Sequence, residues 1–191
     1  MRIVSGSGRG RRLKAPPNDS KTRPMADKIK EALFGSLASF GVQPERILDL
    51  YAGSGAIGIE ALSRGGTWCD FVDRDKIAVQ TIHDNLKNTG FETQGEVHHR
   101  AIESFIGGVR EPYDFVILDP PYADPAILDT LERLSCSGAV QDGTIVVIGH
   151  WPRLEMPDEI GQLSKLRSRC HGDSCFAIFD TVIPEDDRAV D

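Results

Sequence analysis

Long apolar runs, paired-cysteine motifs and internal repeats are missing from this sequence of 191 residues. No apolar run approaches the roughly 18 residues that a membrane-spanning helix needs. The basic N-terminus lacks the apolar stretch of a secretory signal, so we expect the chain to stay in the cytoplasm, away from any membrane. The cysteines form no CxxC pair, which argues against structural zinc, and we expect free thiols at Cys69, Cys136, Cys170 and Cys175. Cys170 and Cys175 flank a turn, and we expect them to be neighbours in a hairpin.

Metal-ligand spacing is also missing around the histidines. His98, His99 and His150 stand at no such spacing from a cysteine or an acid, so we expect no metal site. With 40% hydrophobic and 27% charged residues, the composition excludes a mostly disordered or fibrous chain. The length suits one globular domain.

Positive charge is scarce except at the N-terminal end. The whole chain has 22 Lys and Arg against 29 Asp and Glu, a formal net charge of −7. Residues 1–30 hold nine of the bases and two of the acids, a net +7, which leaves −14 on the other 161 residues. Two interpretations remain open: an arm that binds nucleic-acid phosphates, or a solvated, partly disordered tail.

The N-terminal segment predicts a small hairpin followed by a helix. Residues 2–5 and 11–14 are strand-like and flank a glycine-rich turn. A helix is expected from Pro24, which suits a first helical turn. Its apolar face is formed at helical spacing by Ile29, Leu33, Leu37 and Phe40.

From residue 46 onward, apolar strands alternate with amphipathic helices, a pattern typical of a parallel sheet covered on both faces. The expected strands are 46–50, 68–73, 95–100, 114–118, 143–148, 163–170 and 175–182. The expected helices between them are 56–64, 75–89, 101–108 and 125–134.

The first chemical motif joins a buried strand to a helix through glycines: Asp49-Leu50-Tyr51-Ala52-Gly53-Ser54-Gly55. Glycines let the backbone turn tightly and approach a ligand, and the helix N-terminus offers free N–H groups. Asp49 lies at the carboxyl end of the first parallel strand, where open α/β sheets bind ligands. Asp73 ends the next strand, the position of an acid that holds ribose hydroxyls. The loop and the two acids predict a nucleoside-cofactor site.

The second motif, Asp119-Pro120-Pro121-Tyr122, directly follows the strand expected at 114–118. The prolines stiffen the turn and remove backbone donors. The Asp119 carboxylate and the Pro120 carbonyl are then two fixed acceptors that can hold an exocyclic NH₂ group. Tyr122 offers a ring on which a planar base can stack.

Together the two motifs resemble those of the class I S-adenosylmethionine-dependent amino-methyltransferases, in which the cofactor loop also comes first. Such enzymes modify exocyclic nitrogens of nucleobases or an amide nitrogen. The resemblance implies S-adenosylmethionine as the cofactor. It also implies an α/β, Rossmann-like fold: a mostly parallel seven-stranded sheet with an antiparallel last strand, plus an N-terminal β-hairpin and helix.

Further motifs narrow the resemblance to the RsmD family. They occupy residues 1–6, 9–13, 22–24, 27–34, 60–65 and 85–86. Members methylate the N2 amine of one guanine in small-subunit (16S) rRNA, so the resemblance implies this reaction, with small-subunit rRNA or the assembling 30S particle as partner. Two alternatives stay open: an N-methyltransferase for another RNA or DNA base (adenine N6 or cytosine N4), and a non-catalytic rRNA-binding assembly factor.

The resemblance also assigns roles along the chain, with a basic arm at 1–23 and a methyltransferase domain at 24–191. The expected catalytic residues are Asp119, Pro120, Pro121 and Tyr122. The expected cofactor-binding residues are Asp49, Tyr51, Ala52, Gly53, Ser54, Gly55, Asp73, Arg74, Ala101 and Ile102. The residues expected to hold RNA phosphates are Arg9, Arg11, Arg12, Lys14 and Arg23.

Four positions depart from the family pattern. Asp73 stands where Glu is common, Arg100 where an acid often precedes the alanine, His150 where a glutamate is usual, and Gly35 where an asparagine is frequent. None lies in residues 119–122, so the departures concern the details of cofactor binding and not the second motif.

Overall fold

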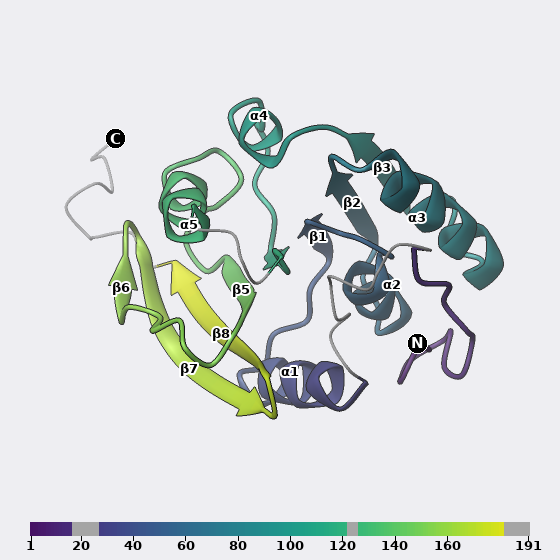
Figure 1. Cartoon of the computed structure of the whole chain (residues 1–191), viewed down its shortest axis with the longest axis horizontal. Helices are drawn as coiled ribbons and strands as arrows, with labels where there is room; N and C mark the ends of the chain where they lie inside the picture. Colours follow the sequence, from purple (N-terminus) through teal and green to yellow (C-terminus); the bar gives the residue numbers. More distant parts are fainter. Residues whose placement is uncertain (17–26, 122–125, 182–191) are drawn as a thin grey trace.

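A mixed β-sheet with helices on both faces forms the body of the molecule (Figure 1). The structure is a computed structural model that describes residues 1–16, 27–121 and 126–181. The strands are β1 (Arg46–Leu50), β2 (Trp68–Asp73), β3 (Gly95–His99), β4 (Phe115–Leu118), β5 (Ile145–His150), β6 (Glu159–Ile160), β7 (Leu163–His171) and β8 (Ser174–Thr181).

The strand order places the ends of β1 and β4 next to each other. Across the sheet it reads β3-β2-β1-β4-β5-β8-β7-β6, and β1 to β5 pair in parallel. The order therefore reverses between β1 and β4. At such a reversal the two connections leave on opposite faces of the sheet, which opens a crevice at the carboxyl ends of the strands.

The expected fold class is confirmed, with one strand more than predicted. The sheet has eight strands in the part of the chain that the structure describes. The additional strand is β6, which pairs with β7 through two residues and is too short to show a period in the sequence. The last strand, β8, is antiparallel as predicted and lies between β5 and β7.

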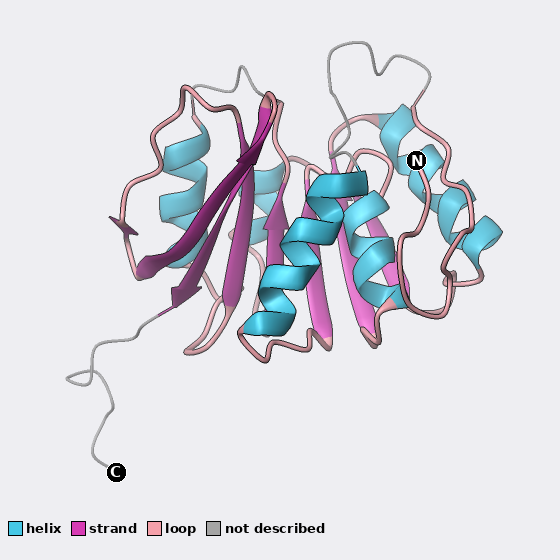
Figure 2. Ribbon diagram, turned by 90° about the horizontal axis from the view of Figure 1, so that it is seen from below, coloured by secondary structure: helices cyan, strands magenta, loops and turns pink. Residues whose placement is uncertain are grey.

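Helices cover both faces of the sheet, as Figure 2 shows. They are α1 (Asp27–Ser39), α2 (Ala56–Ser63), α3 (Lys76–Thr89), α4 (Ile102–Ile106) and α5 (Ile127–Ser135). Residues of α1, α2 and α3 share one hydrophobic core with the sheet, and those of α4 and α5 share the other. Among the described residues, no helix combines the length and apolar character needed to span a membrane.

The predicted apolar face of α1 is confirmed for three of its four members. Ile29, Leu33 and Leu37 are buried in the core. Phe40 lies one residue beyond the end of the helix and is 37% exposed. Its ring instead lies against the guanidinium of Arg167, 4.5 Å from the ring centroid.

The N-terminal segment packs against the body of the protein. The predicted hairpin is present as a single antiparallel bridge between Arg2 and Arg12, and the Ile3 N–H donates to the Arg11 carbonyl at 3.0 Å. Ile3 and Leu13 are buried in the same core as α2 and α3. Residues 1–16 are therefore a packed segment and not a solvated tail, and their binding to nucleic-acid phosphates stays a prediction. We call residues 1–14 the basic arm below.

A buried ion pair ties the basic arm to α1 and α2. The Glu60 carboxylate accepts the N–H groups of Val4 (2.7 Å) and Ser5 (3.0 Å). The Lys30 ammonium lies 4.0 Å from the same carboxylate and donates to the Arg2 carbonyl at 2.7 Å. Both side chains are fully buried. Such a pair stabilises the fold only while both charges are present.

We therefore expect Glu60→Gln to lower the free energy of unfolding by about 3 kcal/mol, because it leaves the buried Lys30 ammonium without the Glu60 charge. Urea denaturation of the wild type and the variant measures the difference. The matched control is Glu60→Gln combined with Lys30→Met, which removes both buried charges and should recover much of the loss. Arg64, the second partner of Glu60 at 2.8 Å, is partly exposed and stays in contact with water. Equal urea midpoints for wild type and single variant would contradict this role of the pair.

The prediction of four free thiols is wrong for two of the cysteines. Cys170 and Cys175 form a disulfide. The register of β7 and β8 pairs them directly across the hairpin, with Cα atoms 4.0 Å apart, so they are hairpin neighbours as expected, but bonded and not free. Cys69 and Cys136 remain free.

Candidate active site

The connection from β1 to α2 is a tight turn in left-handed backbone conformations. The φ angles are +56° at Tyr51, +55° at Gly53 and +73° at Gly55. The Gly55 N–H donates to the Ala52 carbonyl at 2.6 Å and closes the turn. Glycine adopts such angles without strain, whereas Tyr51 does so at a cost that a surrounding structure must offset. Strained backbone of this kind concentrates at functional sites.

Asp49 fixes the start of α2 to the end of β1. Its side chain is 1% exposed, and Oδ2 accepts the Gly58 N–H at 2.9 Å. A Cβ atom at Gly58 would lie 2.5 Å from the ring of Phe71, so a glycine is needed for this close approach. Burial raises the pKa of Asp49 well above its ordinary value, and the charges of Asp119 and Asp73 add to the rise.

Asp73, on the neighbouring strand β2, holds the predicted cofactor loop, which is the turn of residues 51–55. Its Oδ2 accepts the Gly53 N–H at 2.9 Å, and Oδ1 accepts the Asp75 N–H at 2.8 Å. The Ala52 N–H also donates to the Val72 carbonyl at 3.2 Å. The predicted loop and the predicted acid are therefore brought together at the carboxyl ends of β1 and β2.

Removing the Asp73 carboxylate should weaken S-adenosylmethionine binding by roughly 1–3 kcal/mol. Asp73→Ala leaves the Gly53 N–H without its acceptor and removes the carboxylate that the sequence predicts to hold the cofactor's ribose hydroxyls. Calorimetric titration with the cofactor measures the effect. The matched control is Asp75→Ala, which removes an exposed carboxylate that caps α3 at Ile77 and leaves the loop contact intact. Equal cofactor affinity in both variants would refute the assignment of Asp73.

The end of β3 lies beside Asp73, as predicted, but the side chains there differ in accessibility. The Arg100 N–H donates to the Asp73 carbonyl at 3.1 Å. Arg74 and Ala101 are exposed, whereas Ile102 is buried in the core formed with α4 and α5. Any contact of Ile102 with a cofactor therefore has to come from its backbone.

Asp119 and Pro120 lie directly beside the end of β1. The Asp119 N–H donates to the Leu50 carbonyl at 3.3 Å, and its side chain raises the pKa of Asp49. Asp119 is half-buried, Pro120 is buried and Pro121 is exposed. Asp49, Asp73 and Asp119 thus lie within one residue of the carboxyl ends of three adjacent strands, β1, β2 and β4. Tyr122 lies outside the described residues.

His150, one of the departures from the family pattern, ends β5 at the same edge. It is buried, and its Nδ1 lies 3.0 Å from the Trp151 carbonyl. Burial lowers its pKa below the ordinary value, which keeps the ring neutral near pH 7. Trp151, which follows, is 41% exposed.

The predicted RNA-binding residues within the described chain lie on the surface of the basic arm. Arg9, Arg11, Arg12 and Lys14 are all exposed. Arg11 donates to the Thr89 carbonyl. The Lys14 ammonium lies 3.2 Å from the Asp84 carboxylate, an exposed pair of the kind that contributes little to stability. Arg23 lies outside the described residues.

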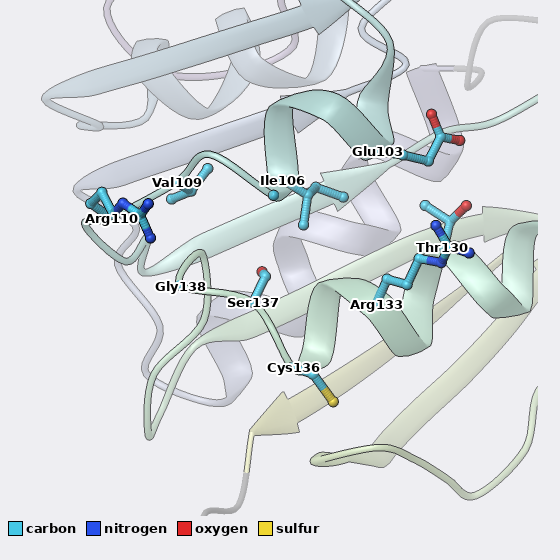
Figure 3. A pocket seen from close by; sticks show the side chains of 10 residues that line it. Glu103, Ile106, Val109, Arg110, Thr130, Arg133, Cys136, Ser137 and Gly138 are labelled. Carbon is cyan, nitrogen blue, oxygen red and sulfur yellow. The ribbon is translucent and has the colours of Figure 1, made fainter.

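Of two clefts on the surface that the described residues form, one is lined in part by predicted site residues and the other is not. A cleft of about 530 Å³ between α4 and α5 is lined by none of the predicted site residues (Figure 3). Two arginines line this cleft: Arg110 lies on the segment that follows α4, and Arg133 lies on α5 (Figure 3). A second cleft of about 490 Å³ is formed by the basic arm and includes Arg2 and Arg12.

One polar cluster, on β2 and β3, was not predicted from the spacing of residues in the sequence. Asp70, Glu96 and His98 place possible ligand atoms within 4.8 Å of one another. Asp70 already accepts hydrogen bonds from His98 Nε2 at 2.9 Å and from the Tyr113 hydroxyl at 2.8 Å, which lower the pKa of Asp70 despite its partial burial. These bonds give the cluster a structural role. The absence of a metal stays a prediction.

Comparison with known proteins places the chain in a family. The model described as "Conserved hypothetical protein 95" matches residues 1–180. The chain belongs to this family. The Bacillus subtilis protein named "Putative rRNA methyltransferase YlbH" is 37% identical over 182 residues, covering 94% of this chain and 98% of its own. The Escherichia coli K12 family member named "Ribosomal RNA small subunit methyltransferase D" is 28% identical over 179 residues, or 94% and 89% of the two chains.

A solved structure supports the same placement. The protein titled "Putative methyltransferase yhhF from Escherichia coli" superposes with a TM-score of 0.81 at 27% identity, covering 95% of this chain and 97% of that one. The resemblance to the RsmD family and the class I methyltransferase fold are thereby confirmed. The roles of the individual site residues stay predictions.

Proposed function

We propose that this family member transfers the methyl group of S-adenosylmethionine to the exocyclic N2 amine of a guanine in small-subunit rRNA. The observation that carries the proposal is the position of Asp119-Pro120-Pro121 beside the glycine loop, with the Asp119 N–H bonded to the last residue of β1. Relatives aligned over nearly the full chain are named for methylation of small-subunit rRNA. The proposed reaction places the enzyme in the cytoplasm with rRNA.

The chemistry divides between cofactor and protein. The sulfonium of S-adenosylmethionine supplies an already reactive methyl group, so the protein mainly positions the reactants and excludes water. The guanine N2 lone pair is delocalised into the ring and is a poor nucleophile. Hydrogen bonds from the amine to the Asp119 carboxylate and the Pro120 carbonyl would orient this lone pair toward the methyl carbon.

The substrate base must leave its stack to reach these acceptors, as it does in other base-modifying enzymes. In the proposal, Tyr122 stacks on the extruded guanine. The exposed bases of the arm hold the RNA backbone near the site without reading its sequence. The arm lies beside α3, on the same side of the molecule as the glycine loop (Figure 1).

The alternatives make different demands on the site. A methyltransferase for adenine N6 or cytosine N4 would use the same acceptors, but sequence-specific DNA enzymes usually carry a separate target-recognition domain. A non-catalytic assembly factor has no need of the strained turn at Tyr51 or of the carboxylate that holds Gly53. The intact cofactor loop therefore favours catalysis.

Mass mapping of 16S rRNA from cells with and without the gene tests the proposal. One guanine should lose a single methyl group when the gene is deleted. Adding purified enzyme and S-adenosylmethionine should restore it, on either naked 16S rRNA or assembled 30S particles, and the comparison identifies the substrate form. A methyl group on adenine N6 or cytosine N4 would favour the first alternative. Binding of rRNA without any methylation would favour the assembly factor.

A further inference from the structure

The side chain of Asn85 on α3 connects the basic arm to the cofactor loop. Its Oδ1 accepts the Lys14 N–H at 2.9 Å, and its Nδ2 donates to the Lys14 carbonyl at 3.0 Å. The same Nδ2 donates to the Ser54 carbonyl at 2.8 Å. Asn85 is 0% exposed. One buried amide thus holds the backbone of two segments that are far apart in the sequence.

The two segments have different roles in the proposed reaction: one binds the cofactor and the other binds RNA. Ser54 stands between the two glycines of the cofactor loop, whose φ angles are +55° and +73°. Lys14 ends the basic arm that carries Arg9, Arg11 and Arg12. A second contact runs in parallel, since the Ser54 hydroxyl lies 3.9 Å from the Met1 sulfur.

We propose that Asn85 is a positioning residue through which cofactor binding at the glycine loop raises the affinity of the basic arm for RNA. The proposal rests on the proposed function, because it assigns the loop to S-adenosylmethionine and the arm to RNA. Asn85 touches neither ligand in this scheme and acts through Ser54 and Lys14.

The physical reason is the cost of breaking any one of the three bonds. A buried amide that loses a partner is left with an unsatisfied polar group, away from water. A cofactor that fixes the loop therefore fixes the Asn85 amide, which in turn fixes the backbone of Lys14. The RNA then binds an arm that is already ordered and loses less conformational entropy. By linkage, RNA must raise cofactor affinity by the same factor.

Fluorescence anisotropy of a labelled RNA hairpin with an unpaired guanine in its loop measures the coupling. The titration is done with and without saturating S-adenosylhomocysteine, which fills the cofactor site without turnover. In the wild type we expect RNA to bind about 5–10-fold more tightly with S-adenosylhomocysteine, within the range of coupled sites. In Asn85→Ala the ratio should fall to about 1.

Ser63→Ala is the matched control. The Ser63 hydroxyl also holds the arm by two bonds, from the Gly8 N–H at 2.9 Å and to the Ser5 carbonyl at 2.6 Å, and both of these bonds go to the arm and not to the loop. It should weaken RNA binding with and without S-adenosylhomocysteine and leave their ratio as in the wild type. A ratio lost equally in both variants would show that general loosening of the arm, not Asn85, is responsible and would overturn the proposal.

Hydrogen exchange on the wild-type protein tests the same link without any substitution, so a folding defect cannot affect the result. S-adenosylhomocysteine should slow exchange at the Lys14 amide and leave the Gly8 amide unchanged. A wild type that binds both ligands with a ratio of 1 and unchanged Lys14 exchange would overturn the coupling alone. A wild type that binds neither S-adenosylhomocysteine nor RNA would overturn the proposed function itself.

Discussion

Replacing Asp119 with alanine is expected to reduce methyl transfer to 16S rRNA by roughly 10²–10³-fold or more, with cofactor affinity kept within a few-fold of wild type. The carboxylate is assigned to the target amine, whereas the cofactor loop is held by Asp73 and Asn85. Its loss therefore removes orientation of the nucleophile and leaves the loop in place. Methyl incorporation at saturating cofactor, together with calorimetric titration of S-adenosylmethionine, measures both quantities.

The control is Asp119→Asn, which keeps the side-chain shape and one carbonyl acceptor. It should retain more activity than Asp119→Ala, because one oxygen can still accept a hydrogen from the amine. The two roles would be reversed if Asp119→Ala lost cofactor affinity and kept turnover while Asp73→Ala did the opposite.

Changing Arg9, Arg11 and Arg12 together to alanine should strongly weaken binding and methylation of RNA while fold and cofactor affinity persist. All three are exposed, so little packing is lost, although the change also removes the hydrogen bond from Arg11 to the Thr89 carbonyl. The 161 residues after residue 30 carry a net charge of −14 and repel the anionic RNA. Without the three arginines, the basic arm offsets this repulsion much less. Each phosphate contact contributes about 0.7–0.9 to the slope of log affinity against log salt, so the slope should flatten by about 2–3.

RNA binding across a salt series provides the measurement, and the loss should be similar for RNAs of different sequence because phosphates carry no base identity. A matched control changes Arg110, Arg133 and Arg169 to alanine, which are exposed and lie outside the arm. The net charge falls equally, but the slope should stay close to that of the wild type. Parallel lines for the arm variant and the wild type would place RNA recognition on other surfaces.

The strands and helices that the local pattern of apolar residues indicates could be predicted from the sequence. The bounds expected for β1 and β2 match those observed, and the helices α2 and α3 lie within one residue of prediction at either end. The two strands are short, mainly apolar runs. In α3 the buried residues recur at helical spacing, and the helix begins after the capping residue Asp75. The position of both motifs at one edge followed from parallel strand order.

The contacts that hold the arm could not be predicted in this way. The sequence pattern around Glu60 and Asn85 is that of ordinary helix residues, and nothing local indicates that their partners are Lys30 and Lys14. The disulfide of Cys170 and Cys175 was missed for a different reason: their proximity across the hairpin was expected, but proximity alone does not indicate that two thiols are bonded. Long-range pairing of polar groups leaves no period in the sequence.

The wide sequence separation of the arm from its partners has a consequence for synthesis of the protein. Val4 binds Glu60, 56 positions later, and Lys14 binds Asn85, 71 positions later. On the ribosome, the basic arm is made before α3, so Ile3 and Leu13 cannot be buried until α3 has also been made. A nascent chain stalled before that point exposes both apolar side chains beside the bases of the arm. The basic arm therefore takes its packed shape only in a chain that already carries the complete glycine loop.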